Sequence, residues 1–212
     1  MTPRHVHSEI LTVMFIDMVG YTRTTSRLSR EEVHQLITDF DQACIPIFHH
    51  FHGFVLKKIG DAFLVTFRSA TDAVLCGIEL QKAFAKQPVQ IRVAIHTGEV
   101  VHRDNDIYGD TVNTAARIEG VAEAGQIMFS ETVFHAMNKN EIQYVHVGVK
   151  RLKGLKHPVR LFRVLTKEDV KRRRRASLKG KVRGFLFWLV LIAIAGAIAY
   201  AFFSGAVQLP AP

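Results

Sequence analysis

The sequence places Gly60 and Asp61 between two short apolar runs, residues 54–59 and 62–67. Two such runs separated by two residues predict a β-hairpin, because glycine lets the backbone reverse its direction tightly. A fold that contains this hairpin must be built on a β-sheet. Asp61 lies at the point of reversal, where its carboxylate is free to bind a ligand.

The order of the other predicted elements indicates which kind of sheet this is. Residues 10–16 predict a buried strand that ends at Asp17. Ser29 and Glu32 form a capping-box pattern, which predicts a long helix that continues until Gly53. The remaining predictions are a helix over 69–84, a strand over 89–101, a loop or arm over 102–108, a helix over 109–120, a strand over 127–129, a helix over 131–137, and strands over 142–151 and 159–164. The order strand, helix, strand, strand, helix, strand predicts a ferredoxin-like α+β sandwich with an added C-terminal portion.

The composition changes after residue 166. Eight lysines and arginines lie between Lys171 and Arg183 with no acid among them, and they account for most of the formal net charge of +9. Residues 185–207 hold no charged side chain and are long enough to cross a bilayer core of about 30 Å as a helix. We therefore predict four parts, which are a domain at 1–166, a basic juxtamembrane segment at 167–184, a single transmembrane helix at 185–207 and a short tail at 208–212.

The charge beside the apolar segment also predicts an orientation. Positive charge next to a span favours the cytoplasmic side of the membrane, so we expect the domain to be cytoplasmic. Two alternatives stay open, since residues 185–207 could form a buried helix of a soluble protein and the basic run could bind nucleic acid. Because the basic run adjoins the apolar segment, lipid phosphates are the favoured partner and no nucleic-acid partner is predicted.

Two carboxylates follow predicted strands and stand close to glycines. Asp17 lies within residues 15–20 (FIDMVG), and Asp61 lies in the hairpin turn. If neighbouring strands bring the two together, their oxygens suit two hard cations, for which magnesium is the natural choice. Two such ions beside a triphosphate activate a hydroxyl group and offset the charge of a leaving pyrophosphate. Either aspartate alone would more often form a turn than bind a metal.

A second polar group lies in residues 106–117 (DIYGDTVNTAAR). Asn113 and Arg117 are four residues apart, so a helix places them on one face. A planar guanidinium is suited to stabilising charge that develops on a phosphate. Without the other motifs, Arg117 would be interpreted as a helix-surface residue that pairs with Glu119 or Asp110.

Residues 15–20, 55–63 and 106–117 together resemble the signature motifs of the class III nucleotide cyclases, and the resemblance extends over residues 11–164. It implies an α+β catalytic domain in which Asp17 and Asp61 bind two ions of Mg²⁺ or Mn²⁺. It also implies contacts with the substrate ATP, made to adenine by Lys57 and Asp106, to the ribose by Asn113, to the α-phosphate by Arg117, and to the other phosphates by Lys153 and the backbone amides of Gly20, Tyr21 and Thr22.

The resemblance further implies a dimer. In that family the metal-binding aspartates come from one catalytic domain, whereas the base, ribose and α-phosphate contacts come from its partner. This chain carries both sets, so a head-to-tail homodimer would hold two equivalent sites. A monomer is then expected to be inactive.

The resulting hypothesis is a membrane-anchored adenylyl cyclase that converts ATP to 3′,5′-cyclic AMP and pyrophosphate. Three alternatives stay open. A guanylyl cyclase shares the fold, but Lys57 and Asp106 argue against it because guanine presents the opposite hydrogen-bonding pattern. A diguanylate cyclase or a polymerase-like palm shares the paired acids but does not call for Asn113 and Arg117. A non-catalytic nucleotide-binding or dimerisation module would typically have lost at least one of these six polar residues.

Overall fold

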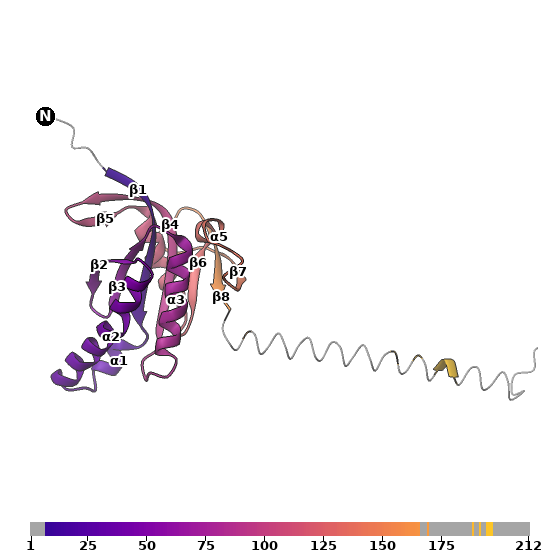
Figure 1. Cartoon of the computed structure of the whole chain (residues 1–212), viewed down its shortest axis with the longest axis horizontal. Coiled ribbons are helices and arrows are strands. Elements are labelled where there is room, and N and C mark those ends of the chain that lie inside the picture. The colour runs from indigo at the N-terminus through magenta and orange to yellow at the C-terminus, as the bar shows by residue number, and fades with distance from the viewer. Residues whose placement is uncertain (1–6, 166–168, 170–187, 189–190, 192–193, 197–212) are drawn as a thin grey trace, which may run out of the picture. The chain divides into compact units, whose positions relative to one another are not determined.

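Figure 1 shows a computed structural model of the chain, which describes residues 7–165, 169, 188, 191 and 194–196. The chain divides into two units, Met1–Val164 and Leu165–Pro212, and the elements below belong to the first. Its described strands form one sheet in the order β2-β3-β1-β4-β6-β8-β7, with β5 paired to β4. The strands are β1 (His7–Met18), β2 (Phe54–Ile59), β3 (Ala62–Phe67), β4 (Ile91–Arg103), β5 (Asp106–Tyr108), β6 (Ile127–Ser130), β7 (Tyr144–Lys150) and β8 (Val159–Val164). The helices are α1 (Tyr21–Thr25), α2 (Arg30–His50), α3 (Ala70–Phe84), α4 (Asp110–Glu119) and α5 (Glu131–Ala136).

The first four strands of the sheet form the predicted ferredoxin-like arrangement. Each of the pairs β2 with β3, β3 with β1, and β1 with β4 is antiparallel, and α2 and α3 lie between strands in the chain as predicted. The next strand, β6, pairs parallel with β4, so the whole sheet is mixed. The predicted hairpin strands at residues 54–59 and 62–67 have the bounds of β2 and β3.

The predicted loop or arm at residues 102–108 is partly a strand. β4 continues to Arg103, and β5 returns beside it with His102 opposite Ile107. Asp104 and Asn105 connect them, with φ of 53° and 59°. Two positive φ values are the geometry of a two-residue hairpin turn, and Asp and Asn tolerate it better than most side chains do. The polar residues therefore form the tip of a strand pair rather than an irregular loop.

The two faces of the sheet carry different helices. Ile16 on β1 is buried in a cluster with Phe48 of α2 and several residues of α3, and Figure 1 shows α3 lying along the sheet. Val13 belongs to a separate cluster that includes Ala115 of α4. Because side chains alternate along a strand, Asp17 shares the face of Val13, which is the face that carries α4. The metal-binding aspartate predicted from the sequence therefore lies on the α4 face of the sheet.

The position of α4 depends on a close approach to β4. A Cβ atom on Gly98 would lie 2.5 Å from Thr111 Oγ1, so a side chain at residue 98 would displace the start of α4. The Thr111 hydroxyl donates a hydrogen bond of 2.6 Å to the backbone oxygen of Glu99. Glycine at position 98 and threonine at position 111 thus hold α4, with Asn113 and Arg117 on it, directly against the sheet.

We expect Gly98→Ala to lower the free energy of unfolding by about 1–3 kcal/mol, because it overpacks this contact. Gly120→Ala is the matched control, since Gly120 has φ −62° and its nearest contacts to an added Cβ would be 3.7 Å and 3.8 Å. Urea unfolding of both variants measures the difference. Equal stability of the two variants would mean that α4 does not need the close approach.

Among the residues that the structure describes, none belongs to a helix with the length and apolar character needed to cross a membrane. The predicted basic segment at 167–184 and the predicted transmembrane helix at 185–207 lie almost entirely outside those residues. The membrane anchor stays a prediction from the sequence.

Candidate active site

The register of the sheet brings the two predicted metal-binding aspartates together. Asp17 on β1 lies opposite Ala62 on β3, and Asp61 precedes Ala62 in the hairpin turn, where Gly60 has φ 63°. The Asp17 side chain is only 14% exposed. Burial raises the pKa of Asp61, and the negative charge of Asp17 raises it further. Two carboxylates that disfavour each other's charge are a suitable pair of ligands for divalent cations.

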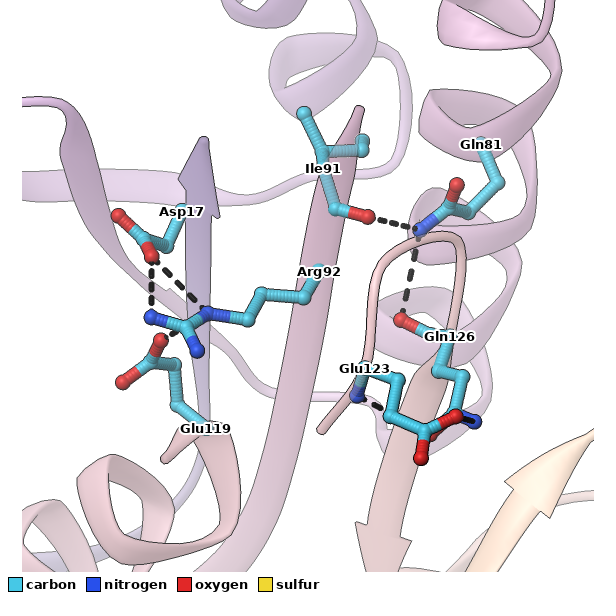
Figure 2. Close-up of polar contacts among 7 residues, drawn as sticks. All are labelled: Asp17, Gln81, Ile91, Arg92, Glu119, Glu123 and Gln126. Carbon is cyan, nitrogen blue, oxygen red and sulfur yellow. Dashed lines mark hydrogen bonds and ion pairs between the residues drawn. The ribbon is translucent and has the colours of Figure 1, made fainter. Parts of the chain in front are cut away.

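Arg92 and Glu119, which the sequence did not place beside the two aspartates, complete this cluster. Arg92 lies opposite Asp17 on β4, and its Nε and Nη2 donate hydrogen bonds of 2.9 Å and 2.6 Å to Asp17 Oδ2. Figure 2 shows that the same guanidinium also meets the carboxylate of Glu119, at the end of α4. At the neighbouring residue of β4, the backbone oxygen of Ile91 accepts a hydrogen bond of 3.0 Å from Gln81 of α3.

The carboxylates of the cluster carry more negative charge than Arg92 alone neutralises. Burial raises the pKa of Glu119 to about 6, against the opposing influence of Arg92 and with further increases from Asp17 and Asp61. Asp17 and Glu119 contact the Arg92 guanidinium, and its charge also acts on Asp61, so three carboxylates share one positive charge and added cations would stabilise them. These residues fit Mg²⁺ or Mn²⁺, with Asp17 and Asp61 as the ligands.

The two predicted adenine-binding residues contact each other. Lys57 on β2 forms an ion pair with Asp106 on β5, and their side chains are 38% and 22% exposed. The hydrogen bond from Lys57 lowers the pKa of Asp106, and Asp106 Oδ1 also accepts a 2.8 Å hydrogen bond from the Ile107 amide. An ammonium donor and a carboxylate acceptor are therefore held side by side.

Lys58 points the other way. It forms an ion pair with Asp41 of α2, and its Nζ lies 5.3 Å from the centre of the Phe63 ring, on the α2 and α3 face of the sheet. Because neighbouring side chains of a strand point to opposite faces, Lys57 lies on the α4 face. The structure thus separates the two lysines, of which only Lys57 shares a face with Asp17.

Asn113 and Arg117 lie on the exposed side of α4, whose buried side is formed by Thr111, Thr114, Ala115 and Ile118. Neither side chain has a hydrogen bond or an ion pair with any residue that the structure describes. Arg117 does not pair with Glu119, as an ordinary helix-surface residue would. Glu119 forms an ion pair with Arg92 instead.

The residues predicted to contact the other phosphates are Lys153 and the start of α1. Lys153 is exposed and follows Leu152, which is buried in a cluster with Ile118 of α4. Gly20 has φ 76° and begins α1, so the amides of Tyr21 and Thr22 belong to the first turn, where N–H groups have no intrahelical acceptor.

The predicted residues therefore form separate groups within one chain. Asp17 lies beside Asp61, Lys57 pairs with Asp106, and Asn113 and Arg117 share one side of α4. Among the described residues, no hydrogen bond or ion pair joins one group to another. No single group offers metal ligands, base contacts and phosphate contacts together, and a nucleotide cyclisation needs all three.

His96, on β4 four residues after Arg92, is a partly buried imidazole outside these groups. Its Nδ1 lies 2.7 Å from Ser130 Oγ and 3.4 Å from Thr132 Oγ1. Burial lowers the pKa of His96 from 6.5 to about 4. The fold therefore favours neutral His96, and this stabilisation is fully present above pH 6.5 and is lost as the pH falls toward 4.

We expect the free energy of unfolding to decrease as the pH is lowered through this window, by at most about 1.4 kcal/mol per pH unit for this one group. His96→Asn should flatten the decrease, whereas His34→Asn, at an exposed position of α2, should not. Urea unfolding at several pH values tests this. A slope that stays the same in His96→Asn would show that another group causes the acid sensitivity.

Comparisons with known proteins identify the family. A sequence model described as the adenylate and guanylate cyclase catalytic domain matches residues 4–189. The chain is 32% identical over 166 residues to the serine/threonine-protein kinase pkn2 of Myxococcus xanthus, and 30% identical over 166 residues to a pH-sensitive adenylate cyclase of Mycobacterium tuberculosis. These alignments cover 74% and 73% of this chain but only 20% and 40% of the two relatives.

Solved structures share the fold. The adenylyl cyclase CyaB of P. aeruginosa superimposes with a TM-score of 0.71 at 26% identity, covering 76% of this chain and 96% of that chain. The guanylyl cyclase Cya2 superimposes with a TM-score of 0.68 at 27% identity, covering 75% and 93%. Because the family's sequence pattern spans most of the chain and its fold matches the described sheet, this chain belongs to the adenylate and guanylate cyclase catalytic domain family.

Proposed function

We propose that the chain is an adenylyl cyclase, which converts ATP to 3′,5′-cyclic AMP and pyrophosphate at the interface of a homodimer. The observation that carries this proposal is the Lys57–Asp106 pair on the α4 face of the sheet. Adenine presents a ring-nitrogen acceptor next to an amino donor. Lys57 can donate to the first and Asp106 can accept from the second, once the base takes the place of their mutual contact.

The second candidate is a guanylyl cyclase, which the likeness to Cya2 keeps open. Guanine presents an oxygen acceptor and an N–H donor in the reverse order at the corresponding positions. A site with Lys57 and Asp106 would then leave partly buried polar groups unpaired, which discriminates between substrates. The residues that face the base therefore favour ATP.

The proposed reaction uses the remaining groups in separate roles. The 3′-oxygen forms a bond to the α-phosphorus, the bond from that phosphorus to the bridging oxygen breaks, pyrophosphate leaves with the electron pair, and the hydroxyl proton goes to solvent. Arg117 stabilises the charge on the α-phosphate, and Asn113 orients the ribose. Two Mg²⁺ or Mn²⁺ ions, when bound to Asp17 and Asp61, would lower the pKa of the 3′-hydroxyl and offset the charge of pyrophosphate.

The proposed homodimer rests on the exposed side chains of α4. Asn113 and Arg117 have no partner among the described residues, and the metal-binding pair of the same chain makes no contact with them. A second copy that faces the α4 side of the sheet could supply to each pair of aspartates the ribose and phosphate contacts that it lacks. A two-fold axis would produce two equivalent sites.

Product analysis tests the proposed substrate. The full chain is incubated with ATP or with GTP and either Mg²⁺ or Mn²⁺, and the products are identified by chromatography and mass spectrometry. We expect 3′,5′-cyclic AMP and pyrophosphate in equal amounts from ATP and far less product from GTP. A preference for GTP would favour the second candidate, and no cyclic nucleotide from either substrate would contradict both.

We also propose that residues 185–207 anchor the chain in a membrane, with the catalytic domain on the cytoplasmic side. The absence of charge in that segment and the basic run before it support this proposal. Cell fractionation tests it. The full chain should sediment with membranes and resist extraction by high salt, and a variant that ends at residue 166 should not sediment.

A further inference from the structure

The far end of β1 carries a cluster of side chains that the proposed reaction does not use. His7 lies directly opposite His102 in the antiparallel pairing of β1 with β4, and Glu9 follows two residues later on the same side of β1. One ligand atom from each of the three lies within 4.8 Å of the other two. The rings of His7 and His102 are 5.4 Å apart between centroids, at an interplanar angle of 63°.

The contacts inside this cluster leave one of its buried polar atoms without a hydrogen bond. His102 Nε2 is 2.6 Å from Glu9 Oε1, yet Nε2 is buried and has no hydrogen bond of acceptable geometry within the described residues. A buried imidazole nitrogen that points at a carboxylate without bonding to it is unusual, because buried polar atoms are nearly always hydrogen-bonded. Two imidazoles and a carboxylate whose ligand atoms lie this close together, with one nitrogen left without a hydrogen bond, could hold a metal ion between them.

We propose that His7, Glu9 and His102 form a binding site for one transition-metal ion of the Zn²⁺ class. Two imidazoles and one carboxylate are ligands that Zn²⁺ prefers, and a water molecule can complete the tetrahedron. Ligand atoms around tetrahedral Zn²⁺ are about 3.3 Å apart, given Zn–N distances of about 2.0–2.1 Å. The Glu9 and His102 atoms, 2.6 Å apart here, would have to move apart to reach that separation, and rotations of the exposed His7 and the partly buried Glu9 and His102 side chains would allow it.

The site is distinct from the catalytic aspartates. Asp17 is ten positions beyond His7 along the extended strand β1, which corresponds to about 33 Å. The ion would instead connect the start of β1 to the arm of β4 and β5. Asp106 begins β5 and pairs with Arg103, the residue after His102. A bound ion therefore restrains the strand pair that carries one of the proposed adenine contacts.

A chelator-competition titration tests the site. The full chain is titrated with Zn²⁺ against a chromophoric chelator in millimolar Mg²⁺, which occupies carboxylate sites but does not compete for imidazoles. We expect one Zn²⁺ per chain, bound at least about 100-fold more weakly by His7→Ala/His102→Ala. His49→Ala/His50→Ala is the matched control, since it also removes two exposed imidazoles, at the end of α2, and it should bind as the wild type does.

Three further measurements make the test independent of a folding defect. Glu9→Gln keeps both imidazoles and should weaken Zn²⁺ binding, and Co²⁺ in place of Zn²⁺ should give the visible spectrum of a tetrahedral site with nitrogen ligands. Hydrogen exchange in residues 101–108 should slow on adding Zn²⁺ to the wild type but not to the double variant. Equal affinity of the wild type and His7→Ala/His102→Ala, or no Zn²⁺ bound by the wild type at micromolar concentration, would overturn the proposal.

Discussion

Mixing the Asp17→Ala and Arg117→Ala variants should restore an ATP cyclisation that neither variant performs alone. Asp17 lies with Asp61 on the sheet, and Arg117 is exposed on α4 without a partner among the described residues. Loss of a metal ligand should abolish turnover. Loss of the group that stabilises charge on the α-phosphate should lower kcat by about 100-fold or more. If each site takes its aspartates from one copy and Arg117 from the other, a mixed dimer has one site with both lesions and one intact site.

The size of the recovery follows from the statistics of pairing. Equal amounts of freely exchanging variants form mixed dimers in about half of the population, and each mixed dimer has one working site of two, so about a quarter of wild-type activity should return. The matched control mixes Asp17→Ala with Asp61→Ala. Both lesions are then on the metal-binding side, every site in every dimer lacks one ligand, and no activity should return.

Two affinity tags, one on each variant, measure the fraction of mixed dimers by successive purification. Cyclic AMP production is then divided by that fraction. Mixed dimers that form but remain inactive would contradict the shared site. Recovery in the control mixture would contradict it as well, because it would mean that Asp17 and Asp61 do not act in the same site.

The sequence was sufficient for the elements whose pattern is local. The β2–β3 hairpin was predicted with its bounds because Gly60 and two apolar runs determine it without reference to the rest of the chain. The arm at residues 102–108 was predicted only in part, since polar residues such as Asp104 and Asn105 are equally common in irregular loops and in hairpin turns. Their ability to adopt positive φ, and the apolar Val101 and Ile107 on either side, were the available indications of a hairpin.

The sequence could not reveal the partners of the predicted site residues. Arg92 faces Asp17 because β1 and β4 pair in one particular register across 75 residues of chain, and a local pattern contains no information about that register. Glu119 is two residues beyond Arg117, yet it points to Arg92 on the sheet while Arg117 is exposed. The direction of each side chain of α4 depends on how the helix packs, which the tertiary structure decides.

Lys57→Met should remove most of the preference for ATP over GTP. Adenine would lose its donor, and Asp106, only 22% exposed, would lose the ammonium group that stabilises its negative charge. We expect kcat/KM for ATP to fall by about 100-fold, which is less than for a fully buried contact because Lys57 is 38% exposed. The value for GTP should change much less, since guanine gains nothing from a lysine in that position. Steady-state kinetics with both nucleotides give the ratio.

Lys58→Met is the matched control, because it removes the neighbouring lysine from the same strand but from the other face. Lys58 pairs with Asp41 of α2 and lies over Phe63, so its loss should lower the free energy of unfolding and leave the ratio of ATP to GTP turnover as it is. A general weakening of β2 would affect both substrates in both variants. Only a direct contact between Lys57 and the base changes the ratio in one variant and not in the other, so an unchanged ratio in Lys57→Met would contradict the assignment of adenine recognition to this pair.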